Sequence, residues 1–131
     1  MKNTIFKLTE YFYYFSLLVL LILYLFPGSL LGYFLYGNLG QQPNLIANPI
    51  GTSINHLIFF SYITVLAIIV RLRIKNIFTN YLVILFIACI LEIFHFIVPN
   101  RSFELYDLIA NFIGVVIILL INSFIKWLKH L

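Results

Sequence analysis

Three acids, one arginine and one histidine lie close together in a chain that has few charged side chains elsewhere. They are Glu92, His95, Arg101, Glu104 and Asp107, whereas charged residues make up only 9% of the whole sequence. A carboxylate beside an imidazole can exchange a proton with it, and an arginine offers a planar set of donors to a phosphate or carboxylate. Ionisable groups at membrane depth are costly, so this cluster marks a candidate functional site.

The composition indicates an integral membrane protein. Of the 131 residues, 63% are apolar and 18% aromatic, and the mean hydropathy is +1.08. So little polar surface could not cover a globule in water. Positions 11–70 hold no Asp, Glu, Lys or Arg, and His56 is their only histidine. We expect a single all-α domain that covers residues 1–131 and crosses the membrane several times.

Four segments are apolar over nearly the 20 or so residues that a spanning helix needs. They occupy positions 11–26, 54–70, 81–98 and 105–127. Pro27 and Gly28 mark the end of the first helix, and Pro99 closes the third. The first segment has no cleavage site after it, so we expect an uncleaved anchor. These features predict a four-helix membrane bundle.

The basic residues predict that both termini are cytoplasmic. With that orientation, seven of the eight basic residues lie inside, and only Arg101 lies outside. The seven are Lys2, Lys7, Arg71, Arg73, Lys75, Lys126 and Lys129. The net charge of +4 is then a consequence of topology, and we expect no nucleic-acid partner. The polar cluster and His56 would lie at the extracytoplasmic face of the cytoplasmic membrane.

The polar residues fall on single stripes of the last two predicted helices. One stripe has the spacing i, i+3, i+7 and the other i, i+4, i+7. They consist of Glu92, His95 and Pro99, and of Asp107, Asn111 and Gly114. The two helices form a hairpin, so we expect the stripes to face each other, with Ala110 and Gly114 allowing close approach of the backbones.

The order of these residues resembles the VanZ-like family of small bacterial membrane proteins, named after a protein associated with teicoplanin resistance. The matching positions are His56, Glu92, Pro99, Arg101, Asp107, Asn111 and Gly114. The resemblance covers about positions 54–120. It differs at Asn55, where the family often has a basic residue, and at His95, where the family has Gln. It implies a role in the cell envelope but no particular chemical mechanism.

We therefore expect an outer polar site that binds an anionic lipid headgroup or a ligand like a peptidoglycan precursor. Arg101 would hold the anion, while Glu92 and His95 exchange a proton or accept hydrogen bonds. Asp107 and Asn111 would orient these groups, and His56 completes the site. The sequence requires no cofactor, and it contains no catalytic constellation from which a reaction could be named.

The same residues also allow a structural interpretation. Glu92 and His95 would then fix the register of neighbouring helices, and Arg101 would join Glu104 and Asp107 in an interfacial ion network. With that role for the polar residues, the chain would be a small accessory or assembly subunit of a larger membrane complex.

Two further features bear on the site. The spacing Glu92-x-x-His95 is part of a di-iron pattern, and His56 and Asp107 could add ligands, but the pattern needs more carboxylates than the chain offers, so we expect no metal. The uncharged loop at positions 27–53 is rich in glycine and aromatic residues, and we expect it to rest on the outer interface as a lid, with its first part a candidate for re-entry. Cys89 is single, which excludes an internal disulfide.

Overall fold

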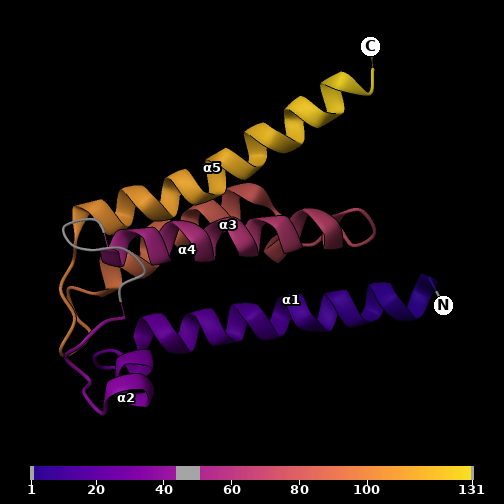
Figure 1. Cartoon of the computed structure of the whole chain (residues 1–131). Coiled ribbons are helices and arrows are strands. Elements are labelled where there is room, and N and C mark those ends of the chain that lie inside the picture. The colour runs from indigo at the N-terminus through magenta and orange to yellow at the C-terminus, as the bar shows by residue number, and fades with distance from the viewer. Residues whose placement is uncertain (1, 44–50, 131) are drawn as a thin grey trace.

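The computed structural model describes residues 2–43 and 51–130, apart from the side chains of residues 2, 3 and 52, and all regular elements in these ranges are helical (Figure 1). The helices are α1 (Lys2–Leu25), α2 (Leu30–Tyr36), α3 (Gly51–Arg71), α4 (Tyr81–Phe94) and α5 (Leu105–Leu128), with a short 3-10 helix, η1, at Ile77–Thr79. The predicted all-α class is confirmed.

Three of the described helices are long and apolar enough to cross a membrane. The spans are Thr4–Leu25, Ser53–Arg71 and Leu105–Leu128. The first helix begins nine residues before its predicted start at position 11, because a helix can continue through the polar side chains Lys7 and Glu10. Such polar first turns fit the membrane-water interface, where charged side chains remain hydrated.

The third predicted span is shorter in the structure than in the prediction of 81–98. Helix α4 begins after the N-cap Asn80 and ends at Phe94. Its 14 residues extend about 21 Å, less than the ~30 Å of a hydrocarbon core. Residues 95–97 form turns, and Pro99 disfavours helix at Val98. Four long spans were therefore predicted, whereas three are seen.

The loop predicted at 27–53 contains a short helix that the sequence did not predict. Ser29 caps α2 by accepting a hydrogen bond from the Gly32 N–H at 2.9 Å. A side chain at Gly32 would collide with the Gln41 carbonyl, because a Cβ there would lie 1.6 Å from its oxygen. Segment 28–41 is thus folded on itself. The remainder of the predicted lid, 44–50, lies outside the described residues.

Helices α3 and α5 form the closest helix pair. A Cβ on Gly114 would lie 2.5 Å from the Leu57 carbonyl oxygen, and the Ser61 hydroxyl donates to the Gly114 carbonyl at 3.1 Å. Ala110 is buried on the same helix. We predicted that Ala110 and Gly114 bring the last two helices, α4 and α5, close together. For Gly114 this prediction was wrong, because Gly114 lies on the face of α5 that packs against α3.

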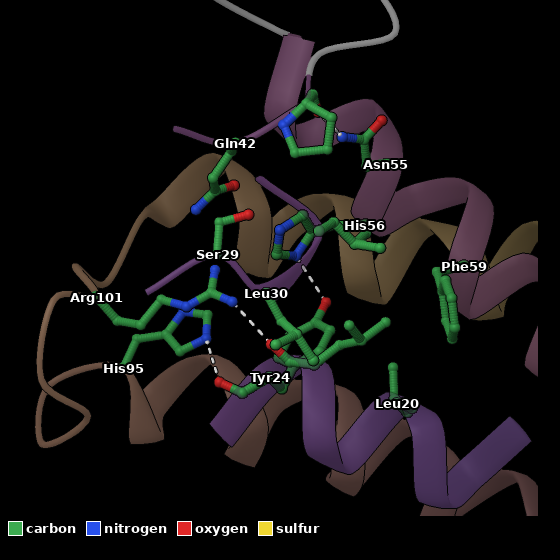
Figure 2. Close-up of a pocket in the computed structure, with 13 residues that line it drawn as sticks. Leu20, Tyr24, Ser29, Leu30, Gln42, Asn55, His56, Phe59, His95 and Arg101 are labelled. Carbon is green, nitrogen blue, oxygen red and sulfur yellow. Dashed lines mark hydrogen bonds between the residues drawn. The ribbon is translucent and has the colours of Figure 1, made fainter. Parts of the chain in front are cut away.

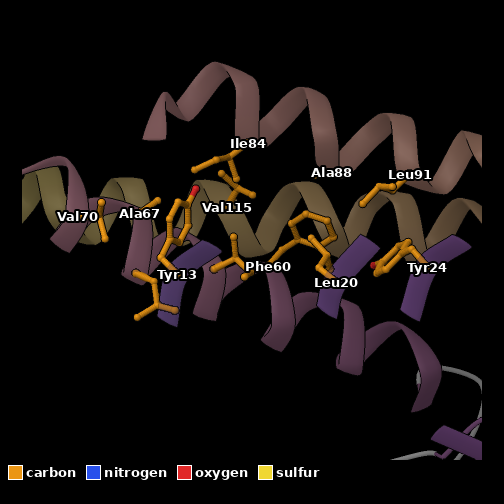
Figure 3. Packing of buried hydrophobic residues seen from close by; sticks show 12 residues of the cluster. Tyr13, Leu20, Tyr24, Phe60, Ala67, Val70, Ile84, Ala88, Leu91 and Val115 are labelled. Atoms are coloured by element: carbon orange, nitrogen blue, oxygen red, sulfur yellow. The ribbon is translucent and has the colours of Figure 1, made fainter. Parts of the chain in front are cut away.

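The core joins α1, α3, α4 and α5. Figure 3 shows Leu20, Phe60, Leu91 and Val115 packed together along the length of these helices. Consecutive long helices run in opposite directions, so the beginning of α1 and the end of α5 lie at one end of the molecule (Figure 1). The polar cluster occupies the other end, where α1 and α4 end and α3 and α5 begin.

Candidate functional site

The polar side chains of the cluster are shielded by the helix ends around them. Glu92 and Asn111 are fully buried, and Asp107 and His95 are each 4% exposed. His56 is 10% exposed in its side chain. The cluster combines groups that lie 55 residues apart in sequence, and the fold places them within hydrogen-bonding range.

His56 lies between the two buried carboxylates. Its Nε2 atom is 3.4 Å from Asp107 Oδ2, and its Nδ1 atom is 3.8 Å from Glu92 Oε2. His56 comes from the second turn of α3, Glu92 from the last turn of α4 and Asp107 from the first turn of α5. The imidazole therefore links three helices.

The Tyr24 hydroxyl fixes the orientation of the His56 ring. It lies 2.8 Å from Asn111 Oδ1, which can only accept, and 2.6 Å from His56 Nδ1. The single hydroxyl hydrogen goes to Asn111, so Nδ1–H of His56 donates to the hydroxyl oxygen. The Asn111 amide donates to the Ala88 carbonyl at 3.2 Å. Nδ1 is thereby occupied, and Nε2 faces Asp107.

Glu92 and His95 form a second pair. Nε2 of His95 is 3.3 Å from the Tyr24 carbonyl oxygen and therefore carries a hydrogen, while Nδ1 is 3.1 Å from Glu92 Oε1. One proton must lie between Nδ1 and Oε1, on either atom. The ring of His95 stacks on that of Tyr24 at 5.5 Å between centroids. The pair is therefore held in place by the end of α1.

The two oxygens of Glu92 have different surroundings. Oε1 also accepts a hydrogen bond from the Glu104 N–H at 3.2 Å, which joins the end of α4 to the start of α5. Oε2 is buried and has no hydrogen-bond partner among the described residues. A buried oxygen without a partner is costly. The site thus retains one acceptor that the protein itself does not satisfy.

Asp107 is held by α3. The Ser53 hydroxyl donates to Asp107 Oδ1 at 2.5 Å, and both side chains are buried. Asp107 also lies in the first turn of α5, where the exposed N–H groups and the helix dipole favour a negative charge. These two interactions orient Asp107 so that its second oxygen, Oδ2, lies toward His56.

A pocket of about 90 Å³ opens beside the cluster (Figure 2). Since one water needs roughly 10–15 Å³ of such a volume, the pocket has room for several waters or one small anionic group. Its polar lining comes from Tyr24, Ser29, Gln42, Asn55, His56, His95 and Arg101. No Asp or Glu of the described residues lines it. The pocket therefore presents cationic and hydrogen-bonding groups, while both buried carboxylates lie behind His56.

Arg101 contributes the permanent positive charge of this pocket. Its Nη2 donates to the Leu23 carbonyl at 2.7 Å (Figure 2), and its buried Nε has no hydrogen-bond partner among the described residues. No carboxylate of residues 2–43 or 51–130 lies within ion-pair distance of it. The predicted alternative of an ion network with Glu104 and Asp107 is therefore not formed. The Nε–H of the guanidinium therefore has no acceptor among the described residues.

Two groups in the loop before α5 have shifted pKa values. Burial lowers the pKa of Arg101, although Glu92, Tyr24 and Asp107 act in the opposite direction, and the guanidinium stays charged. Burial raises the pKa of Glu104, and the nearby Asp107 and Glu92 carboxylates raise it further. The two buried acids thus act electrostatically on the loop before α5.

The structure brings together all six residues of the predicted site. His56, Glu92, His95, Asp107 and Asn111 are joined by the contacts above, and Arg101 lies at the rim of the pocket. Asn55 also lines the pocket and donates to the Pro43 carbonyl at 2.6 Å. Its side chain takes part in holding the loop after α2.

Sequence reasoning missed Tyr24, Ser53 and Ser29. Tyr24 is one of nine tyrosines and lies in an apolar helix, so nothing in its local sequence distinguishes it. Ser53 lies three residues before His56, on the same face of α3, and this spacing is the signal that could have identified it. Ser29 follows Pro27 and Gly28, a pattern that suggests a helix cap.

Comparison of the chain with protein-family models, with curated proteins and with solved structures found no match.

Proposed function

We propose that this chain is a VanZ-like protein of the bacterial cell envelope. It would lie in the cytoplasmic membrane as a four-helix bundle with both termini inside, and its outer pocket would bind an anionic lipid headgroup or a ligand like a peptidoglycan precursor. The shared chemistry of these ligands is a phosphate or carboxylate. The order of His56, Glu92, Arg101, Asp107 and Asn111 supports the family, and the pocket supports the ligand class.

The observation that carries the proposal is the guanidinium of Arg101. Arg101 lines the pocket, its buried Nε has no hydrogen-bond partner among the described residues, and His56 and His95 add imidazoles to the same lining. A planar fork that lacks a carboxylate partner is suited to two parallel hydrogen bonds with an anion. Because the pocket is small, it would take the charged group alone, and the rest of the ligand would lie in lipid or above the membrane.

The proposal is tested by binding of phosphatidylglycerol to the detergent-purified protein, measured by native mass spectrometry. Phosphatidylcholine with the same acyl chains serves as the zwitterionic comparison. Replacing Arg101→Lys should weaken phosphatidylglycerol binding by about tenfold, since an ammonium cannot replace a bidentate contact worth roughly 1.5–3 kcal/mol. A lipid-linked peptidoglycan precursor in the same assay distinguishes the two ligand sources.

Lys129→Arg provides the control, because it also exchanges one basic side chain for the other at constant charge, but it lies at the exposed end of the chain beyond α5. It should leave binding unchanged. Equal binding by the wild type and Arg101→Lys, at equal abundance, would contradict the proposal. In cells, both variants should be as abundant in the membrane as the wild type. Only Arg101→Lys should alter the susceptibility of the cells to teicoplanin.

One observation favours the accessory-subunit alternative. The last part of α5 diverges from the other helices (Figure 1) and exposes Phe124, Trp127 and Leu128. Lipid can cover this surface, and so can a helix of a partner. Native electrophoresis of solubilised membranes distinguishes a lipid-covered chain from a chain bound to a partner. A stable larger assembly that also forms with Arg101→Lys supports the subunit role.

A further inference from the structure

The geometry points to a divalent transition-metal site formed by His56, Glu92 and Asp107, behind the anion pocket. Each of these side chains offers a ligand atom, and the three atoms lie within 4.8 Å of one another. The sequence alone did not lead us to expect a metal, because it has too few carboxylates for a di-iron centre. A mononuclear site needs only three protein ligands.

The distances are close to those that a single ion requires. Ligand atoms about 2.1 Å from a tetrahedral ion lie about 3.4 Å apart. His56 Nε2 and Asp107 Oδ2 are 3.4 Å apart, Glu92 Oε2 lies 3.8 Å from the other ring nitrogen of His56, Nδ1, and the three ligand atoms all lie within 4.8 Å of one another. Binding one ion requires the 4.8 Å spread of the ligand atoms to close by about 1.4 Å, and the ends of the three helices already converge there.

The unsatisfied oxygen of Glu92 is an independent sign of a ligand. Oε2 is fully buried, has no hydrogen-bond partner among the described residues, and lies on the His56 side of its carboxylate. Two buried carboxylates a few ångströms apart also need positive charge nearby. Arg101 does not supply it by contact, because its guanidinium bonds to the Leu23 carbonyl instead. A divalent cation would satisfy both the oxygen and the charge.

The surroundings of His56 match those of a coordinating histidine. Such a residue donates its second ring N–H to a neighbouring acceptor, which fixes the tautomer. Here Nδ1 lies 2.6 Å from the Tyr24 hydroxyl, whose own hydrogen goes to Asn111. Ser53 orients Asp107 in the same manner through its 2.5 Å hydrogen bond. Nitrogen with oxygen ligands favours Zn²⁺ or Mn²⁺ over Mg²⁺.

The experiment is a metal titration of the detergent-purified full chain, produced without a histidine tag and stripped with a chelator. Zn²⁺ is the first probe, and bound metal is measured by inductively coupled plasma mass spectrometry after gel filtration. We expect one Zn²⁺ per chain. Glu92→Gln and Asp107→Asn should each weaken binding by at least about tenfold, the loss that even outer-shell changes cause.

Glu104→Gln is the matched control, because Glu104 lies in the segment between α4 and α5 and its side chain is exposed. It should bind Zn²⁺ as the wild type does. Absence of Zn²⁺ and Mn²⁺ binding by the wild type, or full binding by Glu92→Gln and Asp107→Asn, overturns the site. Failure of anion binding with intact metal binding would overturn only the proposed function.

Co²⁺ decides the question if the variants do not fold. Wild-type protein with Co²⁺ in a tetrahedral nitrogen and oxygen site should absorb in the visible range, and Zn²⁺ should remove these bands. The absence of bands that Zn²⁺ displaces would overturn the inference without any substitution.

Discussion

Tyr24 connects three residues of the cluster, His56, His95 and Asn111, although its local sequence did not identify it. Its hydroxyl contacts His56 and Asn111, its ring stacks on His95, and its backbone carbonyl accepts from His95. The residue lies at the end of α1, so it brings the first helix to a site otherwise made by α3, α4 and α5. Polar groups buried among helices need such partners, since lipid offers none.

Tyr24→Phe should therefore destabilise the protein by about 1–3 kcal/mol, because it leaves Asn111 Oδ1 and His56 Nδ1 with fewer partners in a buried setting. Thermal unfolding in detergent, followed by circular dichroism, measures the loss. Tyr106→Phe is the control, since Tyr106 is 73% exposed and should tolerate the change. Equal unfolding temperatures for both variants would show that the hydroxyl contributes nothing.

The site was more predictable from its charged residues than from its neutral ones. Glu92 and Asp107 stand out because a charge in an apolar segment needs an internal partner. A tyrosine or serine carries no such cost, so Tyr24 and Ser53 became visible only when the fold placed them beside His56 and Asp107. The orphaned Oε2 of Glu92 is likewise a property of three-dimensional packing.

At the scale of elements, hydropathy located the helices better than it located their ends. The last span was predicted at 105–127 and is found at Leu105–Leu128. Helix α4 ends four residues before the predicted 98, because the turn that carries His95 toward Tyr24 begins there. Helix α2 was missed, since seven residues are too few to show a helical period.

Gly114→Ala tests the contact between α3 and α5. The added Cβ would lie 2.5 Å from the Leu57 carbonyl oxygen and 3.2 Å from the Ser61 nitrogen, both backbone atoms, so one helix must move. We expect a loss of about 1–3 kcal/mol in unfolding free energy, typical of overpacking. At Gly40 the Cβ would meet only the Asn38 side chain at 3.4 Å, so Gly40→Ala should be harmless. Wild-type stability of Gly114→Ala would exclude this packing.

At the scale of the whole molecule, the polar cluster lies at one end and most of the basic residues lie at the other. The beginning of α1 and the end of α5 share one end (Figure 1), which also holds the connection between α3 and α4. Arg71 and Arg73 lie there, and the guanidinium of Arg73 stacks over the Phe6 ring at 4.1 Å. Arg101 lies at the other end, beside the pocket. This separation is what the positive-inside rule requires if the termini are cytoplasmic.

The topology can be tested with single cysteines in a Cys89→Ser background. Ser102 and His130 are exposed at opposite ends of the molecule. With the termini inside, a membrane-impermeant maleimide added to intact spheroplasts should label Ser102→Cys at once and His130→Cys only after permeabilisation. Both variants should react equally in detergent, which controls for accessibility. Labelling of His130→Cys in intact cells would place the pocket on the cytoplasmic side, where a peptidoglycan precursor exposed only outside the membrane could not reach Arg101.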